Sequence, residues 1–275
     1  MSTCKLCTGP VSYKFSKTVL KRYKADYFLC GACGSLQVME PTWLDEAYAT
    51  ENWAVDTGLV ARNLEIACRI NSFLSMSCDM NDEIIDFGGG TGLLTRLLRD
   101  MGRSVLCYDA YHKPLFVDAF HISAVEGLNP RAVIASEVFE HFSDPRGSLL
   151  GLIRLAPIII FTTELYTGQD ENWPYLATES GQHIFFFSPQ AIQLVAQLNG
   201  FVTYHAGVLK YLIKGSLVAT PPEKTRVEAA IAASASVEAG LQSFATYLRE
   251  PYRHVAVDHM QELGRFRGTQ SSTPG

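Results

Sequence analysis

The chain has 275 residues, of which 47% are hydrophobic and 19% are charged, and its formal net charge is −5. This length and composition allow one large domain or two modest ones with a sizeable core. A protein that works through phosphate contacts usually carries a basic surface, so nucleic acid is not an expected partner. The longest apolar block, residues 155–161, is too short to cross a membrane, and the N-terminal residues do not form a secretory signal. We therefore expect a cytoplasmic protein.

The N-terminal segment contains two CxxC pairs, Cys4 with Cys7 and Cys30 with Cys33, on either side of a stretch with strand-like alternation. Zn²⁺ binds four thiolates in a tetrahedron, and each CxxC turn supplies two of them. About forty residues bury too little apolar surface to fold alone, so a metal ion would contribute much of the folding free energy. The odd total of seven cysteines argues against a disulfide framework. We predict a zinc ribbon over residues 1–40 with a structural ion, because four cysteines leave no open position for water.

Residues 41–80 have the pattern of helices. Between residues 57 and 74, leucine, valine, isoleucine and alanine recur at helical spacing. We interpret this segment as a helical cap or linker that leads into the next domain.

Strand-like and helix-like segments alternate from residue 82 to residue 215. The predicted strands are 83–87, 104–109, 121–127, 132–138 and 158–165, and the predicted helices are 93–101, 145–156 and 188–200. Segments 201–206 and 208–215 suggest a hairpin that adds an antiparallel element at one edge. Strands that alternate with helices form mostly parallel sheets covered on both faces. The predicted fold is α/β: a doubly wound, Rossmann-like sheet of seven mostly parallel strands, in a domain at residues 81–219.

The remaining segment, residues 220–275, is rich in alanine and has the pattern of helices. We predict a helical C-terminal extension whose last residues, 267–275, are disordered. The helix after residue 225 either mediates a homodimer or packs across the sheet, and the sequence leaves both open.

A loop almost bare of side chains follows the first predicted strand of the sheet. It contains Gly88, Gly89, Gly90 and Gly92. Such a backbone approaches a ligand closely, and its amides open a helix where negative charge is favoured. Asp109, nineteen residues after Gly90, ends the next strand and suits the two hydroxyls of a ribose.

The glycine spacing is GxGxG, whereas the dinucleotide-binding loop reads GxGxxG. Asp86, just before the loop, would repel a pyrophosphate and suits a cationic ligand better. These features favour S-adenosylmethionine, which has a ribose and an amino group but no phosphates, and they disfavour a nicotinamide-dependent oxidoreductase.

Several motifs in order resemble a known family. DFGGGTG resembles the first motif of class I S-adenosylmethionine-dependent methyltransferases, CYDAY resembles the second, and SEVFEHFSDP (136–145) is similar to the fourth-strand motif. The stretch from Trp173 through residue 201 resembles the branch found in sugar and natural-product pathways, which often carries an N-terminal CxxC…CxxC ribbon. The resemblance implies methyl transfer to a small molecule, such as a nucleotide-linked sugar or a natural-product intermediate, at carbon or oxygen. It also makes Ser136 and Glu137 candidate neighbours of the cofactor.

His183 is the first candidate for the base that removes the acceptor's proton, because it lies between the fifth strand and the next helix. The sugar C-methyltransferases that this segment resembles use a Tyr-x-Glu-His pattern, whereas Ser180 and Gln182 occupy the tyrosine and acid positions here. Gln182 could still orient the imidazole by a hydrogen bond. His141 is a second candidate for catalysis.

Other side chains near the strand ends are candidates to hold the substrate. Glu164 and Tyr166 follow the fifth strand, where they could orient an acceptor. Two aromatic pairs, Tyr48 with Trp53 and Trp173 with Tyr175, could line a cleft, although such residues fill cores more often.

Two alternatives to a small-molecule methyltransferase stay open. An RNA methyltransferase could use the ribbon to bind nucleic acid. The basic residues that would serve are Lys14, Lys17, Lys21, Arg22 and Lys24. A non-catalytic methyltransferase-like scaffold is the other alternative, because the residues around His183 depart from the family's pattern.

Overall fold

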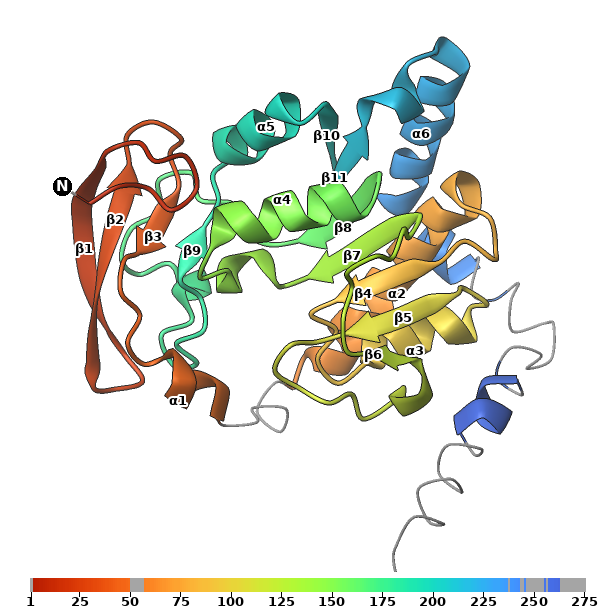
Figure 1. The fold of residues 1–275 in the computed structure, drawn as a ribbon, viewed down its shortest axis with the longest axis horizontal. Coiled ribbons are helices and arrows are strands. Elements are labelled where there is room, and N and C mark those ends of the chain that lie inside the picture. The colour runs from red at the N-terminus through yellow and green to blue at the C-terminus, as the bar shows by residue number, and fades with distance from the viewer. Residues whose placement is uncertain are drawn as a thin grey trace, which may run out of the picture.

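The computed structural model describes residues 2–49, 57–236, 238–242, 245, 255 and 257–262. Figure 1 shows a central sheet with helices on both faces and a small antiparallel sheet beside it, formed largely by the N-terminal residues.

Within the described residues, the central sheet has seven strands. Their order is β10 (Phe201–Ala206), β11 (Leu209–Lys214), β8 (Ile158–Thr162), β7 (Ala132–Ser136), β4 (Ile84–Phe87), β5 (Val105–Tyr108) and β6 (His121–Ile122). The pairs from β8 through β6 are parallel, and β11 pairs antiparallel with both of its neighbours. This arrangement confirms the predicted seven-stranded, mostly parallel sheet with an antiparallel hairpin at one edge. The strand order reverses at β4, and ligands of open parallel sheets bind beside such a reversal.

Helices cover both faces of this sheet because its strands are apolar on both sides. One face packs against α2 (Leu59–Ser77), α3 (Leu93–Asp100) and α6 (Pro221–Ser234), and the other packs against α4 (Pro145–Leu155) and α5 (Pro189–Leu198). Successive residues of a strand point to opposite faces, so Ile84 belongs to the first core and Ile85 to the second. The helix α2 therefore covers the sheet, whereas we expected residues 41–80 to form a cap or linker.

The N-terminal sheet has four antiparallel strands among the described residues. They are β1 (Val11–Val19), β2 (Tyr23–Cys30), β3 (Leu36–Val38) and β9 (Phe185–Phe186). The strand β9 comes from the segment before α5, far along the chain from the other three. Residues 1–40 therefore complete their sheet with a strand from the predicted methyltransferase domain, and α1 (Leu44–Ala49) follows them.

Several predicted boundaries differ from the observed ones. The predicted strand 121–127 is only two residues long, and β7 stops at Ser136 because Glu137 has a φ of +53°. Short 3₁₀ helices complete the described elements: η1 (Asp118–Phe120), η2 (Phe139–His141), η3 (Pro174–Leu176) and η4 (Gly215–Val218).

Part of the predicted C-terminal extension is described. The helix α6 begins with a capping box between Thr220 and Glu223 and packs along α2. Residues 257–262 are helical, and Asp258 receives hydrogen bonds from Arg96 at 2.6 Å and from Arg99 at 2.7 and 2.8 Å. The predicted disordered end lies outside the described residues. None of the described helices is long and apolar enough to cross a membrane.

A glycine-to-alanine pair tests the geometry at the start of α3. Gly92 has a φ of +77°, and a Cβ built there would lie 2.4 Å from Cγ2 of Val117. Gly151 lies within α4 and is exposed, and a Cβ there would meet nothing within 4 Å. We expect Gly92→Ala to lower the free energy of unfolding by about 1–3 kcal/mol and Gly151→Ala to raise it by about 0.5–1 kcal/mol. Denaturant unfolding followed by circular dichroism measures both, and shifts in the same direction would contradict the described turn.

Candidate active site

A cavity of about 710 Å³ opens where the carboxyl ends of β4, β5, β7 and β8 meet. Most of the predicted cofactor and catalytic residues line it: Asp86, Gly88, Gly89, Gly90, Asp109, Ser136, Glu137, His141, Glu164 and His183. The exception is Gly92, which is the N-cap of α3 and is not among the lining residues. Asp86 and His183, almost a hundred positions apart in sequence, therefore line the same cavity.

The glycine loop is held against the end of β5 by its own amides. The N–H groups of Gly88 and Gly89 donate to the carbonyl oxygen of Tyr108 at 2.7 and 3.1 Å. Gly88 has a φ of +71°, and a Cβ there would lie 2.7 Å from Val138. The bare backbone is thus required by close packing on one side, while its other side faces the cavity.

Asp109 is the carboxylate around which this end of the cavity is organised. Its Oδ2 accepts from the N–H of Gly90 at 2.9 Å, and its Oδ1 accepts from those of Tyr111 and His112 at 2.8 Å each. A carboxylate has about four acceptor positions, so roughly one is left for a ligand.

Asp86 is buried at the base of the loop. Its Oδ2 accepts a hydrogen bond from the hydroxyl of Thr95 at 2.7 Å, and only 1% of the residue is exposed. Burial raises the pKa of Asp86 to about 6, because the charged form loses its hydration. A cation beside this carboxyl would favour its ionised form.

Ser136 is the last residue of β7 and Glu137 follows it, and both line the cavity. The hydroxyl of Ser136 lies 3.1 Å from that of Thr162 on β8, and the N–H of Glu137 donates to the same Thr162 hydroxyl at 2.9 Å. The Oε2 of Glu137 accepts from the hydroxyl of Tyr175 at 3.2 Å. Its left-handed backbone thus carries a carboxylate into the site rather than continuing the strand.

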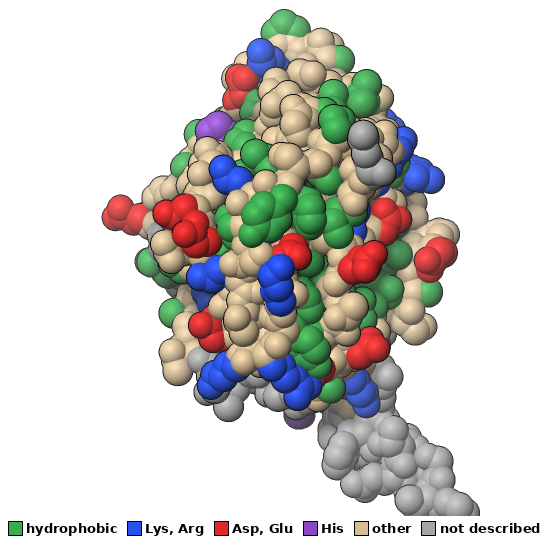
Figure 2. All heavy atoms as spheres, turned by 90° about the vertical axis from the view of Figure 1, so that its left-hand side faces the viewer, with side chains coloured by type: hydrophobic (Ala, Val, Ile, Leu, Met, Phe, Trp, Pro, Cys, Tyr) green, Lys and Arg blue, Asp and Glu red, His purple; other side chains and the backbone are tan. Residues whose placement is uncertain are grey.

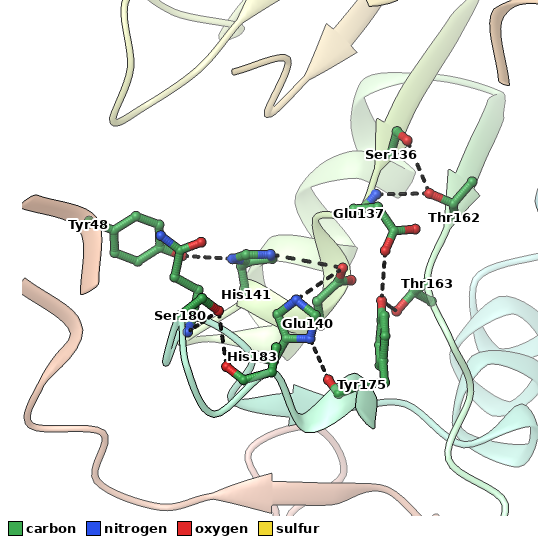
Figure 3. Close-up of polar contacts among 12 residues, drawn as sticks. Tyr48, Ser136, Glu137, Glu140, His141, Thr162, Thr163, Tyr175, Ser180 and His183 are labelled. Atoms are coloured by element: carbon green, nitrogen blue, oxygen red, sulfur yellow. Dashed lines mark hydrogen bonds and ion pairs between the residues drawn. The ribbon is translucent and has the colours of Figure 1, made fainter. Parts of the chain in front are cut away.

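Two histidines lie edge to face at the far end of the cavity, with ring centroids 5.0 Å apart (Figure 3). The Nδ1 of His183 lies 2.6 Å from the carbonyl oxygen of Tyr175, which can only accept. His183 therefore carries its proton on Nδ1 and has a lone pair on Nε2. The Nδ1 of His141 lies 3.0 Å from the hydroxyl of Tyr48. Burial lowers the pKa of both histidines, that of His141 to about 3, so both are neutral near pH 7.

The predicted orientation of His183 by Gln182 is wrong. The amide nitrogen of Gln182 donates to the carbonyl of Ala47 at 2.9 Å, and the hydroxyl of Ser180 donates to the carbonyl of Ala177 at 3.1 Å. The carbonyl of Tyr175 orients the imidazole instead. The amide of Gln182 is thus used in a contact with the segment around Ala47 rather than with its neighbour His183.

Glu140 is a residue of this site that sequence reasoning missed. It is completely buried, and its Oε1 lies 3.9 Å from Nε2 of His141 and 4.0 Å from Nε2 of His183. No hydrogen bond of standard geometry reaches its carboxylate oxygens from the described residues, although the nearby hydroxyls of Tyr175 and Thr163 act to lower its pKa. Burial, followed by the charge of Glu137, raises the pKa of Glu140 to about 8. Its place beside His141 in SEVFEHFSDP was the available signal, but an acid in a loop usually lies in solvent.

The other substrate candidates have different environments. Glu164 is exposed at the cavity wall and accepts from the indole N–H of Trp173 at 3.1 Å. Tyr166 is buried and packs in the core beside the N-terminal sheet. Tyr48 stacks on Tyr111 with centroids 4.5 Å apart, and both line the cavity. Trp53 lies outside the described residues.

The four predicted metal ligands converge at the other end of the N-terminal sheet. The Sγ atoms of Cys4 and Cys33 are 3.7 Å apart, those of Cys7 and Cys30 are 3.5 Å apart, and all four lie within 4.8 Å of one another. A disulfide requires about 2 Å, whereas tetrahedral thiolates bound to zinc at about 2.3 Å lie roughly 3.8 Å apart. The cluster therefore fits a four-thiolate zinc site.

Comparison with known proteins agrees with this geometry. Residues 60–206, more than half of the chain, match the family model described as a methyltransferase domain. The chain belongs to this family. The match confirms that the protein is a class I S-adenosylmethionine-dependent methyltransferase, as its motifs indicated. No curated protein matches the sequence.

Solved structures of methyltransferases are among those similar to this chain. Magnesium protoporphyrin IX methyltransferase from Synechocystis, with bound SAH, is 15% identical, with coverage of 62% of this chain and 90% of that one and a TM-score of 0.42. A putative methyltransferase in complex with the Trm112 activator, from Haloferax volcanii, is 18% identical, with coverage of 58% and 78% and a TM-score of 0.45. An O-methyltransferase family protein from Burkholderia thailandensis is 12% identical, with coverage of 62% of each chain and a TM-score of 0.47.

The burial of Asp86 leads to a prediction about stability and pH. Its pKa in the folded protein, about 6, exceeds the ordinary 3.8, so the folded state binds this proton more tightly than the unfolded state. The resulting stabilisation is complete below about pH 4 and is lost as the pH rises through about 6. We expect Asp86→Asn to gain stability relative to the wild type as the pH rises from 4 to 7.5, by an amount on the order of 3 kcal/mol. Denaturant unfolding of the cofactor-free proteins at several pH values tests this, and a pH-independent difference would contradict it.

Proposed function

We propose that this methyltransferase transfers a methyl group from S-adenosylmethionine to a small-molecule acceptor bound in the same cavity. The observation that carries the proposal is the continuity of that cavity, which reaches from the glycine loop and Asp109 to His141 and His183. Its membership of the methyltransferase family supports the same chemistry.

At the cofactor end, we assign the predicted roles to the residues that line the cavity. Asp109 would accept from a ribose hydroxyl, and the loop from Gly88 to Gly90 would pass beneath the ligand without a side chain in its way. Asp86 places a buried carboxyl next to the loop, which suits a cationic ligand and disfavours a pyrophosphate. Ser136 and Glu137 would lie alongside the cofactor at the end of β7. The cofactor itself supplies the electrophilic methyl group and the leaving group.

At the acceptor end, His183, His141 and Glu164 are the proposed catalytic side chains. They line the part of the cavity beyond Glu137, where an acceptor would be held in line with the methyl group. Tyr48 and Tyr175 supply aromatic walls and hydroxyls for a polar acceptor. The proposed substrate class is a nucleotide-linked sugar or a natural-product intermediate, which rests on the resemblance of residues 173–201 to that branch of the family.

We also propose a division of the chain that follows from the packing. The ribbon, residues 1–40, works together with β9, and α2 joins residues 81–219 in the methyltransferase domain. The helix α6 opens the C-terminal extension and packs along α2.

The arrangement of charges on the ribbon does not favour nucleic acid. Figure 2 shows that Lys and Arg are interspersed with Asp, Glu and hydrophobic side chains on the face that carries the ribbon. Arg22 pairs with Glu46, and Lys24 lies 2.8 Å from Asp26. Because these acids neutralise part of the positive charge on the ribbon, the surface gives no specific support for binding of an RNA substrate.

Calorimetry tests the proposed cofactor site. We expect the wild type to bind S-adenosylmethionine and S-adenosylhomocysteine, and Asp109→Ala to lower both affinities at least tenfold, because both ligands carry the ribose. Glu126→Gln, at an exposed loop position, should leave both affinities unchanged. A folded, zinc-loaded wild type that binds neither compound would exclude the proposal and favour the scaffold.

Removal of zinc tests the ribbon. We propose that Cys4, Cys7, Cys30 and Cys33 bind one structural Zn²⁺, and we expect Cys33→Ser to lose this ion and to melt at a lower temperature. Trp43 and Trp173 both pack in the core beside the ribbon. If the ribbon loosens when zinc is lost, water should reach these indoles and shift the tryptophan emission to longer wavelength. Zinc analysis and a fluorescence melt measure the two effects. A variant that lacks zinc but keeps the wild-type melt would show that the ion is not structural.

A further inference from the structure

Glu140 is a buried acid without a lysine or arginine partner among the described residues. The residue is 0% exposed, and no hydrogen bond of standard geometry reaches either carboxylate oxygen from the described residues, although the hydroxyls of Tyr175 and Thr163 are near enough to lower its pKa. An isolated carboxylate in such a place costs several kcal/mol unless a cation or a proton accompanies it. Near neutral pH a proton can fill this role, and a bound cation could take the place of that proton.

The two neighbouring imidazoles do not supply that group. Their Nε2 atoms lie 3.9 and 4.0 Å from Oε1 of Glu140, beyond the roughly 3.2 Å of a hydrogen bond. His183 carries its proton on Nδ1, so its Nε2 lone pair faces the carboxylate (Figure 3). A lone pair and a carboxylate oxygen are both electron donors, and the space between them suits an electron-pair acceptor.

We propose that Glu140, His141 and His183 bind a divalent transition-metal ion at the inner end of the cavity. One ligand atom from each of the three lies within 4.8 Å of the others. Bonds of about 2.0–2.2 Å would bring such atoms to roughly 3.0–3.6 Å, which requires side-chain shifts of several tenths of an ångström. A ligating histidine commonly donates its second nitrogen to a carbonyl, as His183 does to Tyr175.

Backbone contacts hold these ligands together before any ion binds. The N–H of Ile184 donates to the carbonyl of Glu140 at 2.9 Å, and the carbonyl of Ile184 accepts from Val38 of the ribbon at 2.8 Å. His183 and Glu140 are thereby linked by main-chain hydrogen bonds, although they are far apart in sequence.

The ligand set indicates the class of metal. Two imidazoles and one carboxylate suit Zn²⁺, Mn²⁺ or Fe²⁺, whereas Mg²⁺ and Ca²⁺ prefer sites made of oxygen atoms. The four cysteines form a closed site, but His141 and His183 line the cavity, so an ion here would have positions open to a ligand.

The role of the ion rests on the proposed function. An acceptor hydroxyl bound to the ion would ionise more readily and release its proton to water. The oxygen then forms a bond to the methyl carbon, and the carbon–sulfur bond breaks with its electron pair left on sulfur. The ion keeps its oxidation state throughout. This role makes oxygen the acceptor atom, and it makes His183 and His141 ligands rather than bases.

Metal binding tests the site without knowledge of the acceptor. Zinc-loaded wild type and variants are titrated with Mn²⁺ by electron paramagnetic resonance, and their zinc content after dialysis against Zn²⁺ is measured. We expect one Mn²⁺ per chain, or a second Zn²⁺ beside that of the ribbon. Glu140→Gln and His183→Ala should each weaken this binding at least tenfold. Glu179→Gln changes an exposed acid of the same loop region and should bind like the wild type.

The ribbon zinc and the affinity for S-adenosylhomocysteine show whether each variant is folded, and His141→Asn replaces any that is not. Wild type that binds neither Mn²⁺ nor a second Zn²⁺, or Glu140→Gln that binds them normally, would overturn the metal site. In those cases, calorimetric binding of S-adenosylmethionine would leave the proposed function standing. Metal binding without cofactor binding would instead uphold the metal site and reject the proposed function.

Discussion

The pairing of β4 with β5 on one side and β7 on the other is the constraint on which the site depends. Asp86 is in register with Cys107 of β5 and with Ile134 of β7, so the three strands end at nearly the same level. The chain leaves β4 toward one edge of the sheet and returns to the other side for β7. The loops that follow diverge at this point and leave room for a ligand. The glycine loop, Asp109 and Glu137 meet there only because of this topology.

Among the described residues, buried carboxyl groups without a basic partner are the main polar feature of the cavity. Asp86 and Glu140 are both buried, and within the described residues neither forms an ion pair with lysine or arginine. Such groups reduce stability unless a ligand relieves them, so their presence points to function rather than to packing. The two proposals assign a cationic partner to each end of the cavity: a sulfonium cofactor near Asp86 and a divalent ion at Glu140.

The ribbon acts on the site through the backbone. The strand β9 pairs with β3, in the register of Leu36 with Phe186, and His183 lies two residues before the first paired residue, Phe185. If the four cysteines hold a zinc ion, that ion anchors the sheet whose last strand sets the position of His183. The ribbon then serves the active site as a scaffold, and it needs no contact with nucleic acid to justify its presence.

The sequence by itself determined the features that depend on local signals. Alternating apolar segments predicted the α/β fold and its edge hairpin, glycine spacing located the cofactor loop, and paired cysteines predicted the cluster of thiols. Only the tertiary structure decided that α2 covers the sheet, that β9 completes the ribbon, and that Tyr175 rather than Gln182 orients His183. It also showed Glu140 between two imidazoles. These features arise from contacts between residues that are distant in sequence. The sequence alone does not distinguish a buried acid or amide from a solvated one. Periodicity and spacing report the path of the chain, whereas burial and hydrogen-bond partners are properties of the folded molecule alone.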